Sequence, residues 1–172
     1  YADGKVTKEE LNRQRYLYPL EAVGAGDSTL AKAYERDALA MIPTKSKLMP
    51  HAREVLEYLS GKYNLYILSN GFKELQSHKM RSSGIDEYFK KVVLSDDIGI
   101  LKPWPEIFHF ALSTTQSELN NSLMIGDSWE NDIVGAAGVG MHQVFYNLSG
   151  RTDLPFAPTY QITDLKDLFN FL

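Results

Sequence analysis

Residues 65–71 read Leu-Tyr-Ile-Leu-Ser-Asn-Gly, an apolar strand that runs directly into a polar turn. Residues 122–128, Ser-Leu-Met-Ile-Gly-Asp-Ser, have the same arrangement. Further apolar strands are predicted at residues 92–94, 142–146 and 160–162, the last of them at an edge of the sheet. Helical patterns lie between most of these strands, and apolar strands that alternate with helices indicate a parallel sheet covered on both faces. The sequence therefore predicts an α/β fold.

The N-terminal part of the chain has a helical pattern instead. Thr7 and Glu10 have the spacing of a capping box at a helix start. An apolar stripe at helical spacing follows, made of Leu30, Ala33, Tyr34, Ala38 and Met41. Two such helices need a further surface to bury their stripes. We therefore divide the chain into a helical appendage at residues 1–45 and an α/β core at residues 46–172.

Composition excludes several classes of protein. The 172 residues include 18 Lys and Arg against 22 Asp and Glu, a net charge of −4 that offers no basic face for a nucleic acid polymer. The chain contains no Cys, which excludes disulfides, thiolate metal sites and Cys nucleophiles and is typical of a reducing compartment such as the cytoplasm. No apolar run is long enough to span a bilayer, so we expect no membrane partner. Neither the net charge nor the pattern of apolar residues indicates the oligomeric state.

The turn Ser69-Asn70-Gly71 is the first candidate binding element. Open α/β sheets bind ligands at the carboxyl ends of their strands, and this turn follows such an end. A hydroxyl, an amide and a permissive glycine that open a helix suit an anionic oxygen. The alternative is an ordinary strand-to-helix turn, which favours the same residue types.

Two carboxylates and a lysine complete the candidate site. Asp127 follows a strand directly and Asp132 lies five residues later, so both can converge on one Mg²⁺ ion. The alternative is a helix cap and a first-turn acid. Lys102, which precedes Pro103, can neutralise charge between a phosphate and a carboxylate, or it can be a solvated loop lysine.

The order of these elements resembles motifs II, III and IV of the haloacid dehalogenase (HAD) superfamily. Ser69-Asn70-Gly71, Lys102-Pro103 and Gly126-Asp127-Ser128 with Asp132 carry the resemblance, which covers residues 48–147. Residues 70–76 and 83–85 are most similar to the pyrimidine 5′-nucleotidase branch. The resemblance implies a doubly wound, Rossmann-like parallel sheet with a small helical cap.

The resemblance also implies a Mg²⁺-dependent phosphomonoester hydrolase that forms an aspartyl-phosphate. Ser69 would bind a phosphoryl oxygen, with backbone N–H groups around Asn70 and Gly71 assisting. Lys102 would act as the catalytic cation, Asp127 would ligate Mg²⁺, and Asp132 would support the metal or orient Lys102. Residues 1–45 would close over the site. The substrate would be a small phosphorylated metabolite, with nucleoside 5′-monophosphates as one candidate class.

One departure from the family pattern is large. The family's nucleophile and general acid lie in an Asp-x-Asp motif at the end of a first, central strand, and no Asp-x-Asp occurs in this chain. We therefore expect the first strand to be missing and the nucleophile to lie upstream, in a longer polypeptide, so that these 172 residues alone are inactive. Two alternatives remain. A 2-haloacid dehalogenase also uses Ser-Asn-Gly, and Trp129 is a small point of similarity to that branch; a non-catalytic HAD-like binding module is the other.

Overall fold

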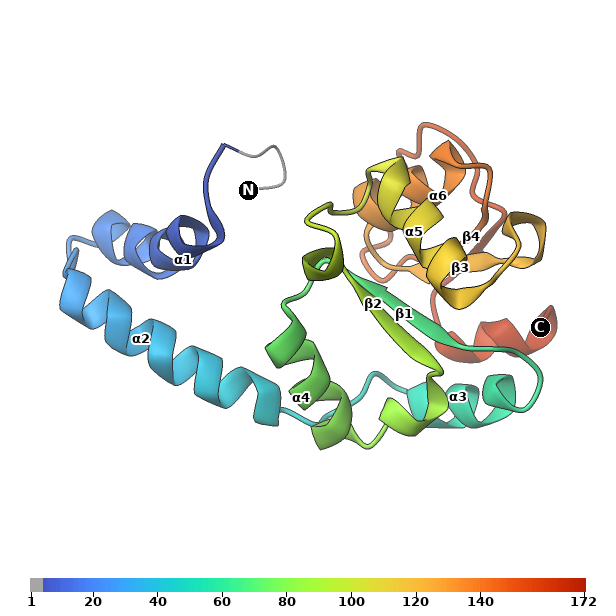
Figure 1. Cartoon of the computed structure of the whole chain (residues 1–172), viewed down its shortest axis with the longest axis horizontal. Helices are drawn as coiled ribbons and strands as arrows, with labels where there is room; N and C mark the ends of the chain where they lie inside the picture. The colour runs from blue at the N-terminus through green and yellow to red at the C-terminus, as the bar shows by residue number, and fades with distance from the viewer. Residues whose placement is uncertain (1–4) are drawn as a thin grey trace.

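Two parallel sheets lie at the centre of the computed structural model, which describes residues 5–172 apart from the side chains of Lys8 and Glu74 (Figure 1). The first sheet pairs β1 (Tyr66–Ser69) with β2 (Lys91–Leu94). The second has the order β3 (Leu123–Gly126), β4 (His142–Tyr146) and β5 (Tyr160–Ile162). All neighbouring strands are parallel, which confirms the predicted α/β class.

The strands β1 and β3 are each paired along one edge only within residues 5–172. All four residues of each strand are half-buried, whereas Gln143, Val144 and Phe145 of the central strand β4 are buried. A strand with one unpaired edge loses the neighbour that would cover its side chains and backbone groups on that side. The strand β5 lies at the opposite edge of its sheet, as the sequence predicts.

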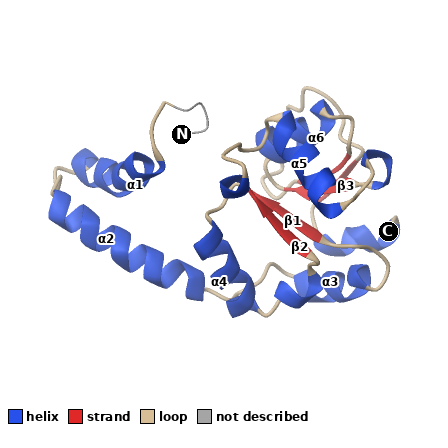
Figure 2. Cartoon of the chain, viewed as in Figure 1, coloured by secondary structure: helices blue, strands red, loops and turns tan. Residues whose placement is uncertain are grey.

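Helices and short turns flank both sheets (Figure 2). The α-helices of the core are α3 (Ala52–Ser60), α4 (Lys73–Ser83), α5 (Pro105–Thr115) and α6 (Val134–Gly138). The 3₁₀ turns of the core are η2 (Asp86–Tyr88), η3 (Ser95–Asp97), η4 (Leu119–Asn121) and η6 (Leu165–Asn170), and η5 (Trp129–Ile133) is a π-helical turn. Asp164 caps η6, where its side chain accepts a hydrogen bond from the Lys166 N–H. No helix in the described part of the chain has both the length and the apolar character needed to cross a bilayer.

The helix α5 packs against both sheets. Its buried residues Ile107 and Phe108 belong to a cluster that also contacts Leu68 of β1 and Met124 of β3. Gly135 of α6 permits this packing, because a Cβ there would lie 2.6 Å from the Phe108 ring. One cluster therefore joins β1 of the first sheet and β3 of the second sheet in a common core.

A helical arm precedes this core. It consists of α1 (Lys8–Ala22), α2 (Ser28–Met41) and the 3₁₀ turn η1 (Ile42–Thr44). α1 and α2 contact one another, η1 contacts α4, and the arm projects away from the sheets (Figure 1). Residues 1–4 of the predicted appendage lie outside the described residues.

Two expectations for the arm need correction. Thr7 caps α1 by accepting a hydrogen bond from the Glu10 backbone N–H at 3.1 Å. The reciprocal half of the capping box is absent from the bonds described, because the Glu10 carboxylate accepts hydrogen bonds from Arg13 and Gln14 instead. The Arg13 guanidinium lowers the pKa of Glu10, since it stabilises the carboxylate form.

The predicted apolar stripe of α2 is not buried as a unit. Leu30, Tyr34 and Met41 are 42%, 61% and 53% exposed, and the buried residue of this helix is Ala31. The reason is that the main neighbours of α2 are α1 and η1, and η1 in turn contacts α4 of the core.

Candidate active site

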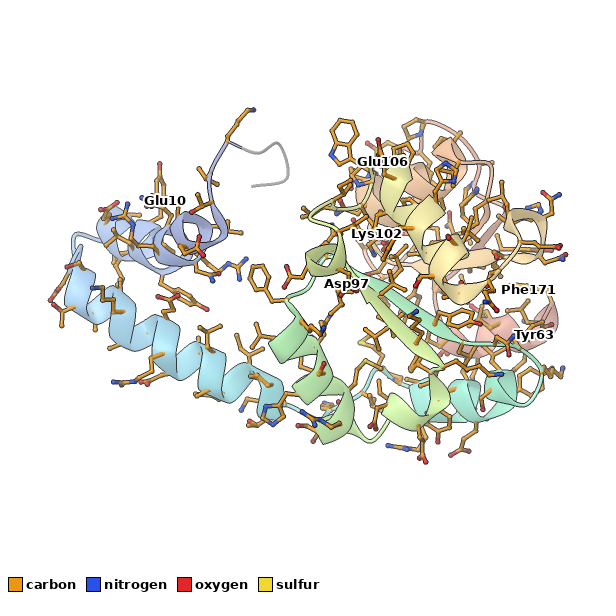
Figure 3. All side chains as sticks on the ribbon, in the orientation of Figure 1. Glu10, Tyr63, Asp97, Lys102, Glu106 and Phe171 are labelled. Atoms are coloured by element: carbon orange, nitrogen blue, oxygen red, sulfur yellow. The ribbon has the colours of Figure 1, made fainter. Side chains whose placement is uncertain are left out.

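Lys102 connects the ends of the two sheets. It lies between η3 and α5, close to the carboxyl ends of β1 and β2 (Figure 3), and its side chain is only 10% exposed. Its Nζ donates to the Leu68 carbonyl of β1 at 2.9 Å and to Asp132 Oδ1 at 2.6 Å. Lys102 is therefore a buried, paired cation and not a solvated loop lysine.

Asp132 is the partner that makes this burial possible. Its side chain is 7% exposed and lies on η5, the turn that follows β3. Oδ2 accepts a hydrogen bond from the Ser128 backbone N–H at 3.1 Å. Gly126 allows the carboxylate to fold back over the strand end, because a Cβ on Gly126 would lie 2.5 Å from Asp132 Cβ and Cγ. Both carboxylate oxygens thus have protein partners.

Asn70 holds the backbone of Lys102. Its Oδ1 accepts from the Lys102 N–H at 2.8 Å, and its Nδ2 donates to the Lys102 carbonyl at 3.0 Å. This two-point contact fixes the loop from which the lysine side chain projects. The side chain of Asn70, expected to help bind substrate, is therefore used to position Lys102.

Ser69 ends β1, and its hydroxyl oxygen accepts two hydrogen bonds. The Gly71 N–H donates at 3.0 Å and Gln76 Nε2 donates at 2.6 Å. A Cβ on Gly71 would lie 2.6 Å from Gln76 Nε2, so the glycine leaves room for the glutamine side chain. Sequence reasoning assigned no role to Gln76. The available signal was the position of Gln76 in the first turn of α4, five residues after Gly71, which has no side chain to occupy the same space.

Asp127 differs from Asp132 in its surroundings. It follows β3 directly and its side chain is exposed. No cluster of three or more His, Cys, Asp or Glu side chains able to hold a metal ion occurs within the described part of the chain. Mg²⁺ needs only one or two protein carboxylates and takes its remaining ligands from water and substrate. Asp127 therefore fits as one ligand, and Asp132, which accepts one hydrogen bond at each oxygen, supports Lys102 and keeps lone pairs that fit a second ligand.

The turn η5 is also anchored by contacts with β4 and with the loop that follows β4. Trp129 is buried and packs edge-on against Phe145 with ring centroids 5.2 Å apart. Arg151 donates to the Glu130 carboxylate at 2.6 Å, and this hydrogen bond lowers the pKa of Glu130. These contacts hold the segment that carries Asp132. They also explain Trp129 as a packing residue.

The sequence matches the haloacid dehalogenase-like hydrolases over residues 5–140, which is most of the chain. The chain belongs to this family. The match includes the helical arm as well as the three site segments, and it confirms the resemblance inferred from their order.

Relatives of this haloacid dehalogenase-like hydrolase include a nucleotidase. The pyrimidine 5′-nucleotidase YjjG of Escherichia coli is 29% identical over 174 residues, which cover 100% of this chain and 76% of that protein. The HAD-hydrolase YfnB of Bacillus subtilis is 29% identical over 176 residues, covering 100% of this chain and 73% of its own length.

Solved structures show the same fold. The magnesium-bound crystal structure of YfnB matches with a TM-score of 0.88 and 27% identity over 99% of this chain and 74% of that one. A 2-haloacid dehalogenase from Pseudomonas syringae matches with a TM-score of 0.70 and 27% identity over 94% of this chain and 69% of its own. The family is therefore settled, and a structure named as a 2-haloacid dehalogenase shares the fold.

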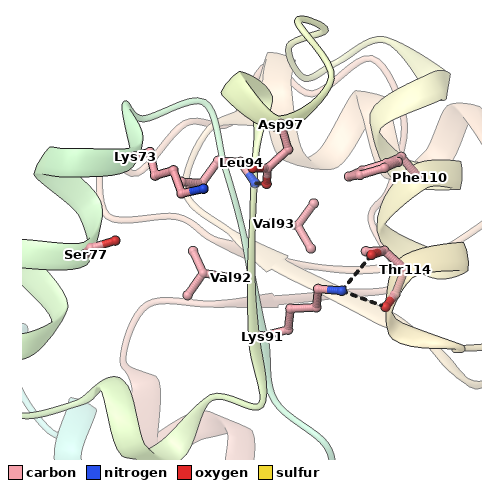
Figure 4. Close-up of a pocket in the computed structure, with 9 residues that line it drawn as sticks. All are labelled: Lys73, Ser77, Lys91, Val92, Val93, Leu94, Asp97, Phe110 and Thr114. Carbon is pink, nitrogen blue, oxygen red and sulfur yellow. Dashed lines mark hydrogen bonds between the residues drawn. The ribbon is translucent and has the colours of Figure 1, made fainter.

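A separate hollow of this hydrolase lies along β2 between α4 and α5 (Figure 4). It has a volume of about 380 Å³, and Lys91 on its wall donates from Nζ to the Thr114 carbonyl and hydroxyl. Its lining residues include none of Ser69, Lys102, Asp127 and Asp132. The hollow is therefore distinct from the candidate active site.

Proposed function

We propose that this haloacid dehalogenase-like hydrolase is a Mg²⁺-dependent phosphatase of small phosphorylated metabolites, with nucleoside 5′-monophosphates as its first candidate substrates. The observation that carries the proposal is the buried Lys102–Asp132 pair at 2.6 Å. Lys102 bonds to the carbonyl of Leu68, the neighbour of Ser69, and Asp132 bonds to the N–H of Ser128, the neighbour of Asp127. These contacts support the proposal that the Ser69 hydroxyl, the Lys102 ammonium and the exposed Asp127 carboxylate act on one substrate at the carboxyl ends of β1 and β3.

The nucleophile is proposed to be an Asp on a segment outside these 172 residues. The free edges of β1 and β3 support this proposal, because both strands are half-buried and contact the same α5 cluster. A strand inserted between them would pair with both edges and would end beside Ser69 and Lys102. The helical arm, residues 1–45, is proposed to act as a cap that selects the leaving group and excludes water.

The reaction proposed has two displacements. The Asp carboxylate attacks phosphorus, the bond to the leaving oxygen breaks, and that oxygen takes a proton from an acid on the same outside segment. The deprotonated acid then takes a proton from water as the water oxygen attacks phosphorus, the bond between phosphorus and the Asp oxygen breaks, and inorganic phosphate is released. Ser69 donates to a phosphoryl oxygen and Lys102 offsets the growing negative charge, which lowers the energy of the transition state more than that of the bound substrate. When bound at Asp127, Mg²⁺ supplies further charge stabilisation of the phosphoryl oxygens.

The test compares residues 1–172 alone with the longer protein that we propose, in which a segment carrying the nucleophile precedes Tyr1. We expect the longer protein to release inorganic phosphate from nucleoside monophosphates or sugar phosphates only with Mg²⁺, and the shorter chain to release none. Asp127→Asn should abolish turnover, whereas Asp86→Asn, a matched change of an exposed Asp in η2, should leave it unchanged. Turnover by residues 1–172, or full activity of Asp127→Asn, would refute these assignments.

Dehalogenation is the second candidate, because the Pseudomonas syringae 2-haloacid dehalogenase shares the fold. The same preparations should be tested for halide release from 2-haloacids in the presence of a metal chelator. Chelator-resistant halide release without phosphatase activity would favour this candidate. Loss of both activities in an intact, folded protein would favour a non-catalytic binding module.

A further inference from the structure

The hydroxyl of Ser69 has an unusual set of partners. A serine hydroxyl has one hydrogen to donate and two lone pairs that accept. The Gly71 N–H and Gln76 Nε2 point at the oxygen, at 3.0 Å and 2.6 Å. Among the hydrogen bonds described for residues 5–172, none uses Ser69 as a donor. Its acceptor capacity is filled while its hydrogen stays available.

We propose that Gln76 is a positioning residue that makes Ser69 an obligate hydrogen-bond donor toward an anionic oxygen of the substrate. The inference rests on the proposed phosphatase function and names a residue through which it works. With both lone pairs occupied, Ser69 offers only O–H to a ligand, so it favours a phosphoryl or carboxylate oxygen over a donor group or a cation. Ser69, Gly71 and Gln76 are all half-buried, which shelters the arrangement and leaves it reachable.

Gly71 is the residue that makes the Gln76 contact possible. An added Cβ at Gly71 would lie 2.6, 2.7 and 2.8 Å from Nε2, Cγ and Cδ of Gln76, so a larger residue would push the amide away from Ser69. Gly71→Ala is therefore expected to have the same effect as Gln76→Ala. Each change removes the same hydrogen bond, so the double variant should be no worse than either single variant.

A double-mutant cycle in the longer protein separates this role from a structural one. Gln76→Ala should lower kcat/KM about tenfold, the loss typical of one hydrogen bond. Ser69→Ala should lower it by roughly a hundredfold or more, as for loss of a transition-state donor. Adding Gln76→Ala to Ser69→Ala should change nothing further, because Gln76 acts through the hydroxyl. Additive losses in the double variant would overturn the proposal.

Gln76→Glu tests the direction of the hydrogen bond. A carboxylate has the shape of the amide but only accepts, so it would take the Ser69 hydrogen away from the substrate. We expect this variant to lose more activity than Gln76→Ala. Wild-type activity in Gln76→Glu would show that Ser69 does not need a donor at this position. His78→Ala, an exposed change on the same helix, should leave kcat/KM and the unfolding midpoint unchanged.

Binding of inorganic phosphate to the longer protein gives a readout that does not need turnover. Calorimetry with Mg²⁺ present should give a Kd about tenfold weaker for Gln76→Ala, again the loss of one hydrogen bond, and no further weakening when that change is added to Ser69→Ala. If phosphate binds as expected but no phosphomonoester is cleaved, the proposed function fails and this inference stands. If wild-type protein shows no saturable phosphate binding, or Gln76→Ala binds phosphate as wild type does, the inference fails.

Discussion

In the hydrogen bonds described for residues 5–172, the buried Lys102 ammonium uses two of its three N–H donors. An ammonium group has three N–H donors, and the Leu68 carbonyl and Asp132 Oδ1 accept two of them. Asn70 fixes the backbone from which the side chain projects. These contacts fix the position of the ammonium group before any ligand binds, which is the pre-organisation that electrostatic catalysis requires.

The first prediction concerns the Lys102–Asp132 pair. Asp132→Asn removes the charge that compensates the buried ammonium, so it should cost about 3–5 kcal/mol of unfolding free energy, measured by chemical denaturation. Asp153→Asn, at an exposed carboxylate, should cost little. The double variant Lys102→Met/Asp132→Leu should recover much of the stability but no activity. If Asp132→Asn had the unfolding free energy of the wild type, the Lys102–Asp132 pair would not stabilise the fold as proposed.

The second prediction concerns Gly126. In Gly126→Ala the new Cβ would lie 2.5 Å from Asp132 Cβ and Cγ, so the carboxylate must move away from Lys102 and Ser128. The variant should lose activity in the longer protein and unfold at lower denaturant concentration. Gly138→Ala is the matched control, because a Cβ added there would meet nothing within 4 Å and the helix favours Ala. If Gly126→Ala and Gly138→Ala had the same activity and unfolded at the same denaturant concentration, this steric explanation would be wrong.

At the scale of single elements, α1 depends on its cap. Thr7 Oγ1 accepts from the Glu10 N–H, and the reciprocal contact from the Glu10 side chain is replaced by bonds from Arg13 and Gln14. Thr7→Ala should destabilise α1 by about 1 kcal/mol, the usual value of an N-cap. Hydrogen exchange at the first turn of α1 should become faster, whereas Thr29→Ala, whose hydroxyl is not the cap of α2, should leave it unchanged.

The turn η5 should respond to acid through Glu130. Arg151 lowers the pKa of this carboxyl below its ordinary value of 4.5, so the contribution of the pair to stability is present above pH 4.5 and is lost as the pH falls through the lowered value. Arg151→Ala should move the NMR titration midpoint of Glu130 up toward 4.5. Arg81→Ala, a change in the last turn of α4, should leave the titration midpoint of Glu130 unchanged. An unchanged midpoint in Arg151→Ala would contradict the assigned cause.

At the scale of the whole molecule, we expect one further strand to pair with β1 of the first sheet and β3 of the second. β1 and β3 each pair along one edge within residues 5–172 and share the α5 cluster through Leu68 and Met124. If a strand from the preceding segment inserts between them, backbone amides on these edges should gain protection from hydrogen exchange. β5, at the outer edge of the second sheet, serves as the internal control. Unchanged exchange in β1 and β3 of the longer protein would exclude the insertion.

Local sequence pattern was sufficient for most elements of the core. The strands β4 and β5 have the predicted bounds, and β1, β2 and β3 differ from the prediction by one residue at their ends. Apolar runs, glycines and caps act over a few residues, so they can be read without knowing the fold. The α2 stripe was less predictable, since an apolar face shows that a helix can pack but not whether a surface is present.

The sequence by itself determined the parallel α/β class and the loop tips that carry Ser69, Lys102 and Asp127. Only the tertiary structure decided how their neighbours are used: Asp132 pairs with Lys102, Asn70 holds a backbone 32 residues away, and Gln76 donates to Ser69. The physical reason is that strand and turn propensities are local, whereas the partner of a buried polar group depends on which distant segment packs beside it.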